Sequence, residues 1–343
     1  MDVRDCGDSG TESKGYSMAV GAERGEIGFS VVGVHGIWQG AATGKQLSEW
    51  WKRALADGLA AADAPDLRVP SFSVPSYTRA LRCSSRRLGA ELVPVETTGL
   101  GELDEAEDDF AVESFEGLAA MGGGPFAGGA PEESGPSLGV RDVSVRLARA
   151  MAAFDTRFGR NASSVALRAL REVYAYLEHE DRAERVRGIV SEAIGRETRV
   201  LVAHSLGSVV AYDILRRGEA MSAWGGIDLL ITCGSPLRWP SVRRRIGEEY
   251  GLLRIPRRTD WVNVFDPADM VTGGAGLADV AARVRDEPVE NGASNPHAVV
   301  RYLDKRQTAE ALLSVRGLWH LSGSDEGERC GLGPATYHRG HGP

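Results

Sequence analysis

The chain has 343 residues, of which 42% are apolar and 26% charged, and this excludes a wholly disordered, collagen-like or coiled-coil protein. Its 40 basic and 48 acidic side chains give a formal net charge of −8. The acidic excess lies in residues 88–140, which hold twelve acidic residues and no Lys or Arg. The remainder carries 40 basic and 36 acidic residues, so no general nucleic-acid binding is expected.

Both ends of the chain are polar and rich in glycine, which predicts disordered tails at 1–26 and 321–343. The first 26 residues lack the apolar core of a secretory signal, and no apolar run approaches the ~18 residues of a membrane span. The four cysteines show no CxxC spacing, so neither a zinc site nor a disulfide framework is indicated. We therefore expect a cytoplasmic protein without a stable membrane span.

Predicted strands alternate with predicted helices between the two tails. Continuous Val-rich runs indicate buried parallel strands, and apolar residues at helical spacing indicate amphipathic helices. This order predicts an α/β fold, an open and mostly parallel sheet with helices on both faces, within one domain at 27–320. The predicted elements are a strand at 26–36, a helix at 43–62, a weak strand at 67–77, helices at 140–158, 165–177 and 185–194, a strand at 199–204, a helix at 206–215, strands at 227–233, 261–265 and 284–289, and a helix at 298–313.

The acidic segment 88–140 interrupts this order. It contains eleven Gly and four Pro and shows no sustained period, which predicts an insertion that is either disordered or a mobile lid. The helices at 141–194 after it predict a helical cap. Arg243, Arg244 and Arg245 are interpreted as solvated charges, with a docking surface for the acidic insertion as the alternative.

The motif Ala203-His204-Ser205-Leu206-Gly207 joins a predicted strand to a predicted helix. Small residues two positions before and after the serine permit a sharp turn that lifts the hydroxyl above the sheet edge. The same turn directs the backbone N–H of Leu206 toward the space where an oxyanion would develop. The pattern predicts that Ser205 is a nucleophile, against the alternative of an ordinary strand–helix turn.

A serine nucleophile needs a base, because its free hydroxyl is too weakly acidic to attack at neutral pH. Elimination among the seven histidines favours His297, in a Gly/Asn/Pro loop before the last helix. The others lie in or at the C-terminal tail, in an acidic helix, beside the nucleophile or at the end of the first strand: His320, His338, His341, His179, His204 and His35.

The base needs an acid that holds its tautomer, and a carboxylate just beyond a buried strand is well placed to do so. Asp266 and Asp269 both follow the strand at 261–265. We place the acid at Asp269, because the loop needs a few residues to reach from the sheet to His297. Asp266 stays the alternative, although it also fits as the cap of the turn at Pro267.

The first predicted strand ends in Val34-His35-Gly36-Ile37-Trp38. A strand that ends in His-Gly brings backbone close to a reacting carbonyl, so Ile37 is expected to supply the second oxyanion N–H, with Trp38 as the alternative donor. Trp38 and His35 are the candidate substrate contacts. An ordinary tight turn at His35-Gly36 is the alternative interpretation.

These motifs together resemble the α/β-hydrolase fold, and in particular bacterial lipase- and esterase-like serine hydrolases. The resemblance rests on a "VHGI" opening, an "AHSLGSVVAYD" elbow and "GSPL" after the next strand, and it covers approximately 27–85 and 141–316. In that family the chain order is nucleophile, acid, histidine, as Ser205, Asp269 and His297 stand here. The first hairpin of larger members has no counterpart in this sequence.

The resemblance implies a metal- and cofactor-independent serine hydrolase that cleaves an ester or another acyl bond of a small molecule. Two alternatives remain open at this point. One is an α/β-hydrolase fold used as a binding or signalling module without turnover, and the other is a thioesterase or peptidase with the same triad. The oligomeric state is not indicated.

Overall fold

The structure is a computed structural model. It describes residues 26–27, 29–36, 42–65, 67, 71–82, 103–120, 144–218, 226–247, 251–315 and 319–320. Outside this part of the chain lie residues 1–25 and 321–343 of the predicted tails, residues 37–41, and 88–102 and 121–140 of the predicted insertion. Glu26, the last residue of the predicted N-terminal tail, belongs to a strand instead. Within the described part, no helix is both long enough and apolar enough to cross a membrane.

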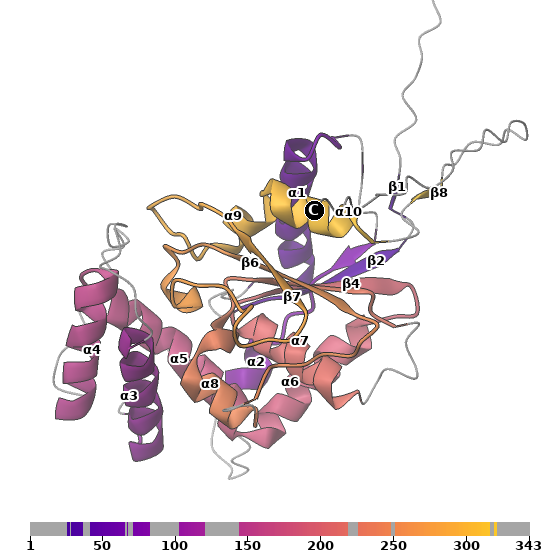
Figure 1. Cartoon of the computed structure of the whole chain (residues 1–343). Coiled ribbons are helices and arrows are strands. Elements are labelled where there is room, and N and C mark those ends of the chain that lie inside the picture. Colours follow the sequence, from indigo (N-terminus) through magenta and orange to yellow (C-terminus); the bar gives the residue numbers. More distant parts are fainter. Residues whose placement is uncertain are drawn as a thin grey trace, which may run out of the picture.

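A six-stranded sheet forms the centre of the molecule (Figure 1). Its strands follow the order β3-β2-β4-β5-β6-β7, every neighbouring pair is parallel, and the two edges stay open within the described residues. This confirms the predicted α/β class with an open, mostly parallel sheet. The strands are β2 (Ser30–Val34), β3 (Phe72–Ser73), β4 (Thr198–His204), β5 (Leu229–Cys233), β6 (Asp260–Phe265) and β7 (Val284–Pro288).

The central strand β4 shows why this sequence needs cover on both faces. Successive side chains of a strand point to opposite faces, and on β4 both sets are apolar and buried. Val200 and Val202 pack into one core, and Leu201 and Ala203 pack into the other. The sheet thus separates two hydrophobic cores. The predicted strand at 67–77 is only the two residues of β3, in a segment that contains two prolines, Pro70 and Pro75.

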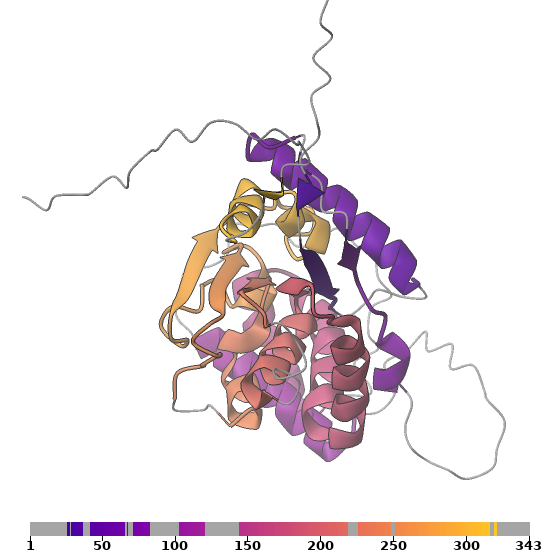
Figure 2. The ribbon, with the colours of Figure 1, turned by 90° about the vertical axis from the view of Figure 1, so that its right-hand side faces the viewer.

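Helices α1 (Gly44–Ala61), α9 (Val299–Leu303) and α10 (Arg306–Leu313) cover one face (Figures 1 and 2). A capping box starts α1, in which Thr43 and Gln46 each satisfy a backbone amide of the other. The predicted single helix at 298–313 is two helices. The break after Leu303 lies against Gly58 of α1, where an added Cβ would be 2.4 Å from the Leu303 carbonyl oxygen. The chain thus turns where another helix crosses it.

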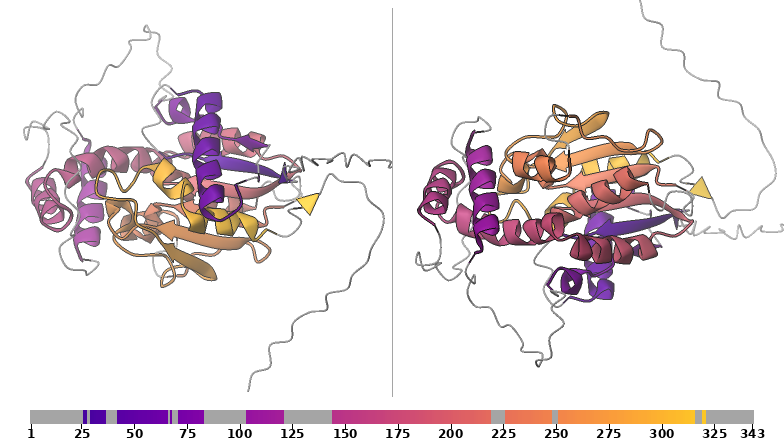
Figure 3. Two further views of the ribbon diagram at one scale, coloured as in Figure 1. Left: turned by 90° about the horizontal axis from the view of Figure 1, so that it is seen from above. Right: turned by 90° about the horizontal axis from the view of Figure 1, so that it is seen from below.

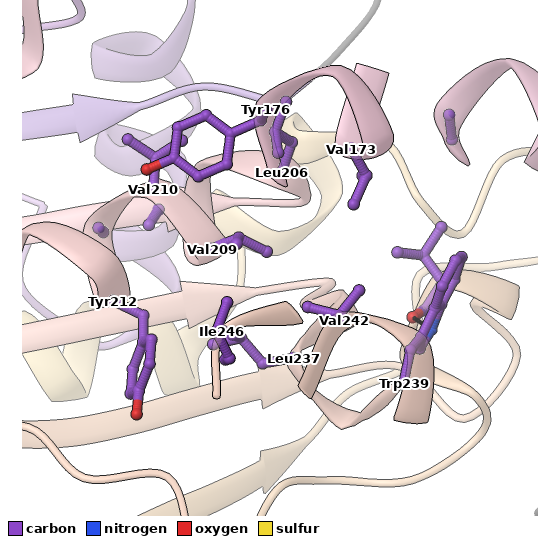
Figure 4. Packing of buried hydrophobic residues seen from close by; sticks show 14 of the residues in the cluster. Val173, Tyr176, Leu206, Val209, Val210, Tyr212, Leu237, Trp239, Val242 and Ile246 are labelled. Atoms are coloured by element: carbon purple, nitrogen blue, oxygen red, sulfur yellow. Dashed lines mark hydrogen bonds between the residues drawn. The ribbon is translucent and has the colours of Figure 1, made fainter. Parts of the chain in front are cut away.

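The opposite face is covered by helices that follow the predicted helical segments. Helix α7 packs through Val209 and Val210 between α5 and the turn that leads into α8 (Figure 4). Helices α4, α5 and α6 confirm the three helices predicted between 140 and 194. The elements of this layer are α2 (Thr78–Arg82), α5 (Ala162–Glu178), α6 (Glu180–Ala193), α7 (Leu206–Arg217), the 3-10 turn η2 (Pro236–Arg238) and α8 (Pro240–Arg245).

Helices α3 (Glu105–Ala120) and α4 (Val145–Phe158) pair beside the carboxyl edge of the sheet and extend away from it (Figures 1 and 3). Helix α3 was not predicted, because its buried side chains lie on more than one side of the helix and show no single period. Phe110 and Phe115 are nonetheless fully buried, against α5, α8 and α4. The Glu113 carboxylate lies 3.3 Å from Arg244 and 3.1 Å from Arg245, so these arginines dock the acidic helix.

A short antiparallel pair stands apart from the main sheet. Strand β1 (Glu26–Ile27) pairs with β8 (Trp319–His320), so segments from the two ends of the predicted domain lie side by side.

Candidate active site

The candidate site lies where four parallel strands end at the same edge of the sheet. The pairing aligns Val34 with Ala203, His204 with Cys233, and Cys233 with Val264. The residues that follow β2, β4, β5 and β6 therefore meet at the carboxyl edge. Ligand sites of open α/β sheets lie in this position.

Ser205 occupies a strained turn between β4 and α7. Its backbone has φ 55° and ψ −128°, in the positive-φ range that non-glycine residues rarely adopt, at a cost of about 1–3 kcal/mol. The Ser205 amide donates to the Cys233 carbonyl at 3.1 Å, which holds the turn to the end of the next strand. A strained serine between a buried strand and a helix N-terminus is the arrangement of a nucleophile elbow.

Two glycines allow the backbone to close around this serine. A Cβ on Gly207 would lie 2.0 Å from the Val34 carbonyl oxygen, and a Cβ on Gly36 would lie 2.6 Å from the Ser205 Cβ. Both distances are far below van der Waals contact, so only glycine fits either position. The end of β2 can therefore pass directly beside the serine.

Ser205, His297 and Asp269 form a continuous hydrogen-bonded row. The Ser205 Oγ lies 3.0 Å from the His297 Nε2, and the His297 Nδ1 lies 2.7 Å from the Asp269 Oδ2. Because an ionised carboxylate only accepts hydrogen bonds, the Nδ1 carries the proton and the Nε2 accepts from the serine hydroxyl. The structure brings these three sequence-predicted residues together from three separate loops.

Asp269 lies fully buried at the start of the 3-10 turn η3 (Met270–Thr272). Burial alone would raise the pKa of this carboxyl. The His297 charge and hydrogen bonds from His297, Tyr302 and the Val271 amide outweigh burial and lower the pKa below its ordinary value. The group is thus held as a carboxylate.

Asp266, the alternative acid, has a different set of contacts. Its Oδ1 accepts from the Ala268 amide at 2.7 Å, and its Oδ2 accepts from the Asn291 amide at 2.6 Å. The Asn291 side chain donates in turn to the Pro296 carbonyl at 2.7 Å. Asp266 therefore caps its own turn and anchors the loop that carries His297.

His204 links the Ser205 turn to the loop that carries His297. Its Nε2–H donates to the His297 carbonyl at 2.8 Å, and the two rings lie 4.6 Å apart. Burial first, and then the His297 charge, lower the pKa of His204 from 6.5 to about 3, so it stays neutral. Its buried Nδ1 has no hydrogen-bond partner within the described part of the chain.

His35 lies at the end of β2 with both ring nitrogens engaged inside the protein. Its Nδ1–H donates to the Gly36 carbonyl at 2.6 Å, and its Nε2 accepts from the Tyr77 amide at 3.3 Å. The ring stacks on Tyr77 at 4.0 Å, and burial lowers the pKa of His35 to about 4. His35 is buried, with 1% of its surface exposed, and these contacts fix the backbone beside Ser205.

The candidate oxyanion donors are described in part. Leu206 is the first residue of α7, so its amide belongs to the first turn, whose N–H groups have no acceptor within the helix. The positive end of the helix dipole adds favourable potential for an anion there. Ile37 and Trp38, the other candidate donors and substrate contacts, lie outside the described residues.

Three site residues were missed by the sequence reasoning. The Tyr302 hydroxyl donates to the Asp269 Oδ2 at 2.7 Å, and the Trp239 indole donates to the Val271 carbonyl at 2.7 Å. Gly234 has φ 54°, and a Cβ there would lie 2.9 Å from the Asp269 Oδ2. Only Gly234, within the quoted "GSPL" motif, gave a signal. Tyr302 and Trp239 belong to none of the motifs quoted from the sequence.

A buried charge cluster supports α7 behind the site. The Asp213 carboxylate accepts from the Tyr176 hydroxyl at 3.0 Å and the Arg187 guanidinium at 3.0 Å. Arg216 and Arg217 of α7 also donate to it. Helices α5, α6 and α7 are thereby joined at one carboxylate.

Comparisons of the chain with models of known protein families, with curated proteins and with solved structures gave no match. The described residues contain no group of three or more His, Cys, Asp or Glu arranged to hold a metal ion. The fold and the contacts within this chain therefore carry the functional argument.

Proposed function

We propose that the protein is a serine hydrolase of the α/β-hydrolase type that cleaves ester-like bonds through an acyl-enzyme. The observation that carries the proposal is the hydrogen-bonded row from the Ser205 Oγ through His297 to Asp269, with Ser205 on a strained strand–helix turn. Such a row activates a serine, because the base takes the hydroxyl proton as the oxygen attacks.

The proposed reaction has two halves. In the first, His297 Nε2 removes the Ser205 proton, the Oγ–carbonyl carbon bond forms, and the carbonyl oxygen becomes an oxyanion near the Leu206 N–H. The carbon–leaving group bond then breaks, and the proton on Nε2 passes to the leaving alcohol. In the second half, water gives a proton to His297 and attacks the acyl-enzyme, and the proton returns to Ser205 as the acid is released.

Asp269 has two tasks in this scheme. Its bond to Nδ1–H keeps the tautomer in which Nε2 is free to accept a proton, and its charge stabilises the imidazolium that forms. His204 and Asn291 support the same step through backbone, since they hold the carbonyls of His297 and Pro296. The chemistry proposed here uses side chains and backbone of this chain alone.

The contact geometry favours this proposal over a non-catalytic binding module. A fold kept only for binding would not need its serine and histidine within hydrogen-bond reach, and here the distance is 3.0 Å. A thioesterase or peptidase would use the same three residues in the same roles, so the type of acyl bond is a matter for a substrate panel.

The test is hydrolysis of p-nitrophenyl acetate, butyrate and octanoate by the full chain and by the Ser205→Ala variant. Ser208→Ala is the matched control, because Ser208 is also buried but, among the described residues, its hydroxyl bonds only the Ala203 carbonyl. We expect loss of turnover in Ser205→Ala and retention in Ser208→Ala. Equal turnover by the wild type and Ser205→Ala would overturn the assignment of Ser205 as the nucleophile. The rates measured in the same assay with thioesters and peptide anilides show which type of acyl bond the protein cleaves best.

A further inference from the structure

The carboxylate of Asp269 distributes three hydrogen bonds unevenly over its two oxygens. The Oδ1 accepts one bond, from the Val271 amide at 2.9 Å. The Oδ2 accepts two, from the His297 Nδ1–H at 2.7 Å and from the Tyr302 hydroxyl at 2.7 Å. The oxygen that faces the histidine is therefore shared with a second donor.

Tyr302 is built to act as a donor to this oxygen. It lies on α9, is fully buried, and its hydroxyl oxygen also accepts from the Asp266 amide at 3.3 Å. With that acceptor position filled by an N–H, the phenol proton points to Asp269. Burial first, and then the Asp269 charge, raise the pKa of Tyr302 well above its ordinary value, so the phenol keeps its proton over the working range.

Two donors on one carboxylate oxygen compete for the same negative charge. A phenol that donates to the Oδ2 stabilises the carboxylate and leaves less charge to hold the imidazolium of His297. We propose that Tyr302 is a positioning residue that sets how strongly His297 holds a proton, by sharing the Asp269 Oδ2 with it. The catalytic consequence of this inference rests on the proposed function.

The other ionisable groups that face this trio among the described residues are His204 and Asp266. His204 lies 4.6 Å from the His297 ring and 6.0 Å from the Tyr302 ring, and it is neutral because burial lowers its pKa. The carboxylate of Asp266 is occupied by the amides of Ala268 and Asn291. Removing the Tyr302 hydroxyl leaves the His204 ring and the Asp266 carboxylate with their hydrogen bonds, and only the backbone amide of Asp266 loses an acceptor.

The variant that isolates this hydroxyl is Tyr302→Phe, and the chain offers a matched control in Tyr176→Phe. Tyr176 is also fully buried and its hydroxyl donates to a buried carboxylate, Asp213, at 3.0 Å, away from the row of Ser205, His297 and Asp269. Both variants remove one buried phenol–carboxylate bond. Only Tyr302→Phe removes one that His297 shares.

The first measurement is the pH dependence of kcat/KM for p-nitrophenyl butyrate. In Tyr302→Phe, Asp269 is left with more charge for His297, so the acid limb is expected to move to higher pH by about half a unit to one unit. Tyr176→Phe is expected to leave the limb in place. A limb that stays within 0.2 units (roughly the resolution of such profiles) in Tyr302→Phe would overturn the inference.

The second measurement does not need turnover. NMR titration of ring-labelled histidines follows the protonation midpoint of His297, assigned with a His297→Gln variant, in the wild type and in both phenylalanine variants. We expect a higher midpoint for the His297 ring in Tyr302→Phe alone. 3-Fluorotyrosine incorporated at position 302 is a more acidic phenol and a stronger donor, so it is expected to lower the midpoint of His297. This second variant also provides a test if Tyr302→Phe does not fold.

The two proposals fail in different ways. If the wild type neither hydrolyses esters nor reacts with a serine-directed probe, but the His297 midpoint shifts as described, the proposed function fails and the coupling through Asp269 stands. If the wild type is active and both changes at position 302 leave the midpoint where it was, the coupling fails and the hydrolase proposal stands.

Discussion

Replacing Gly207 with alanine tests the close approach between the end of β2 and the turn that carries Ser205. The added Cβ would lie 2.0 Å from the Val34 carbonyl oxygen, 2.6 Å from its carbonyl carbon and 2.7 Å from the His35 carbonyl oxygen. Backbone atoms cannot move aside as flexible side chains do. Relief to an ordinary contact requires β2 and the start of α7 to separate by about 1 Å.

That separation has two costs. Forcing an extra methyl into a packed core lowers the free energy of unfolding by about 1–3 kcal/mol, and the rigid neighbours of Gly207 place it at the upper end. Under the proposed function, a displacement of about 1 Å between Ser205 and the proposed oxyanion donors is expected to lower kcat/KM by about 100-fold in molecules that remain folded.

Urea denaturation and ester hydrolysis at a temperature where the variant is folded measure these two effects. Gly188→Ala is the control, because nothing lies within 4 Å of a Cβ at this exposed position of α6. It is expected to keep full activity and to gain about 0.5–1 kcal/mol, the usual difference between Ala and Gly in a helix. Wild-type stability and activity in Gly207→Ala would refute the reasoning about the elbow.

Three further predictions concern stability. Folding lowers the pKa of His204 from 6.5 to about 3 and that of His35 from 6.5 to about 4. Between these folded-state values and 6.5, the unfolded chain binds more protons than the folded chain. The free energy of unfolding therefore decreases as the pH falls through that range. His204→Gln keeps an N–H donor but removes one ionisable group. Urea denaturation at pH 7.0, 6.0 and 5.0 (roughly spanning the shift) is expected to show a pH dependence of the unfolding free energy that is smaller by up to about 1.4 kcal/mol per pH unit than in the wild type. An unchanged pH dependence would contradict the burial of a neutral His204. Asp213→Ala leaves the buried Arg187 without its buried partner and is expected to lower the free energy of unfolding by about 3–5 kcal/mol. Asp181→Ala removes an exposed ion pair and is expected to lower it by less than about 1 kcal/mol. Equal losses would contradict a stabilising role of the buried charge cluster. Phe115→Ala in α3 is expected to lower the free energy of unfolding by about 3–5 kcal/mol, because this fully buried ring packs edge-on against Phe154. A loss below about 1 kcal/mol would mean that α3 is not an integral part of the core.

The sequence predicted the parts of the fold that rest on local pattern. Continuous apolar runs located β4, β5 and β6, and helical spacing located α1 and α4–α7 within a few residues. The break after Leu303 escaped prediction, because it lies against Gly58 on a distant helix, and the local pattern does not show such a long-range contact. Helix α3 escaped because its burial comes from α4, α5 and α8 around it, which a single amphipathic stripe does not reveal.

In the candidate site, too, the residue with a local sequence pattern was predicted, and one brought in by long-range packing was not. Ser205 carries a local signature, since a strand, a turn of small residues and a helix are contiguous in the chain. His297 and Asp269 were inferred from chain order and elimination, and the structure places both within hydrogen-bond distance of their expected partners. Tyr302 had no sequence signal, because its meeting with Asp269 depends on how α9 packs over the acid loop.

Active-site labelling tests the central claim most directly. The full chain is treated with a fluorophosphonate probe, and the modified peptide is identified by mass spectrometry in the wild type, Ser205→Ala and Ser208→Ala. We expect one adduct, on the Ser205 Oγ, in the wild type and in Ser208→Ala, because His297 and Asp269 activate that oxygen alone. No adduct is expected in Ser205→Ala. Labelling that persists in Ser205→Ala, or a wild-type chain that takes no label, would contradict the assignment of Ser205 as an activated nucleophile.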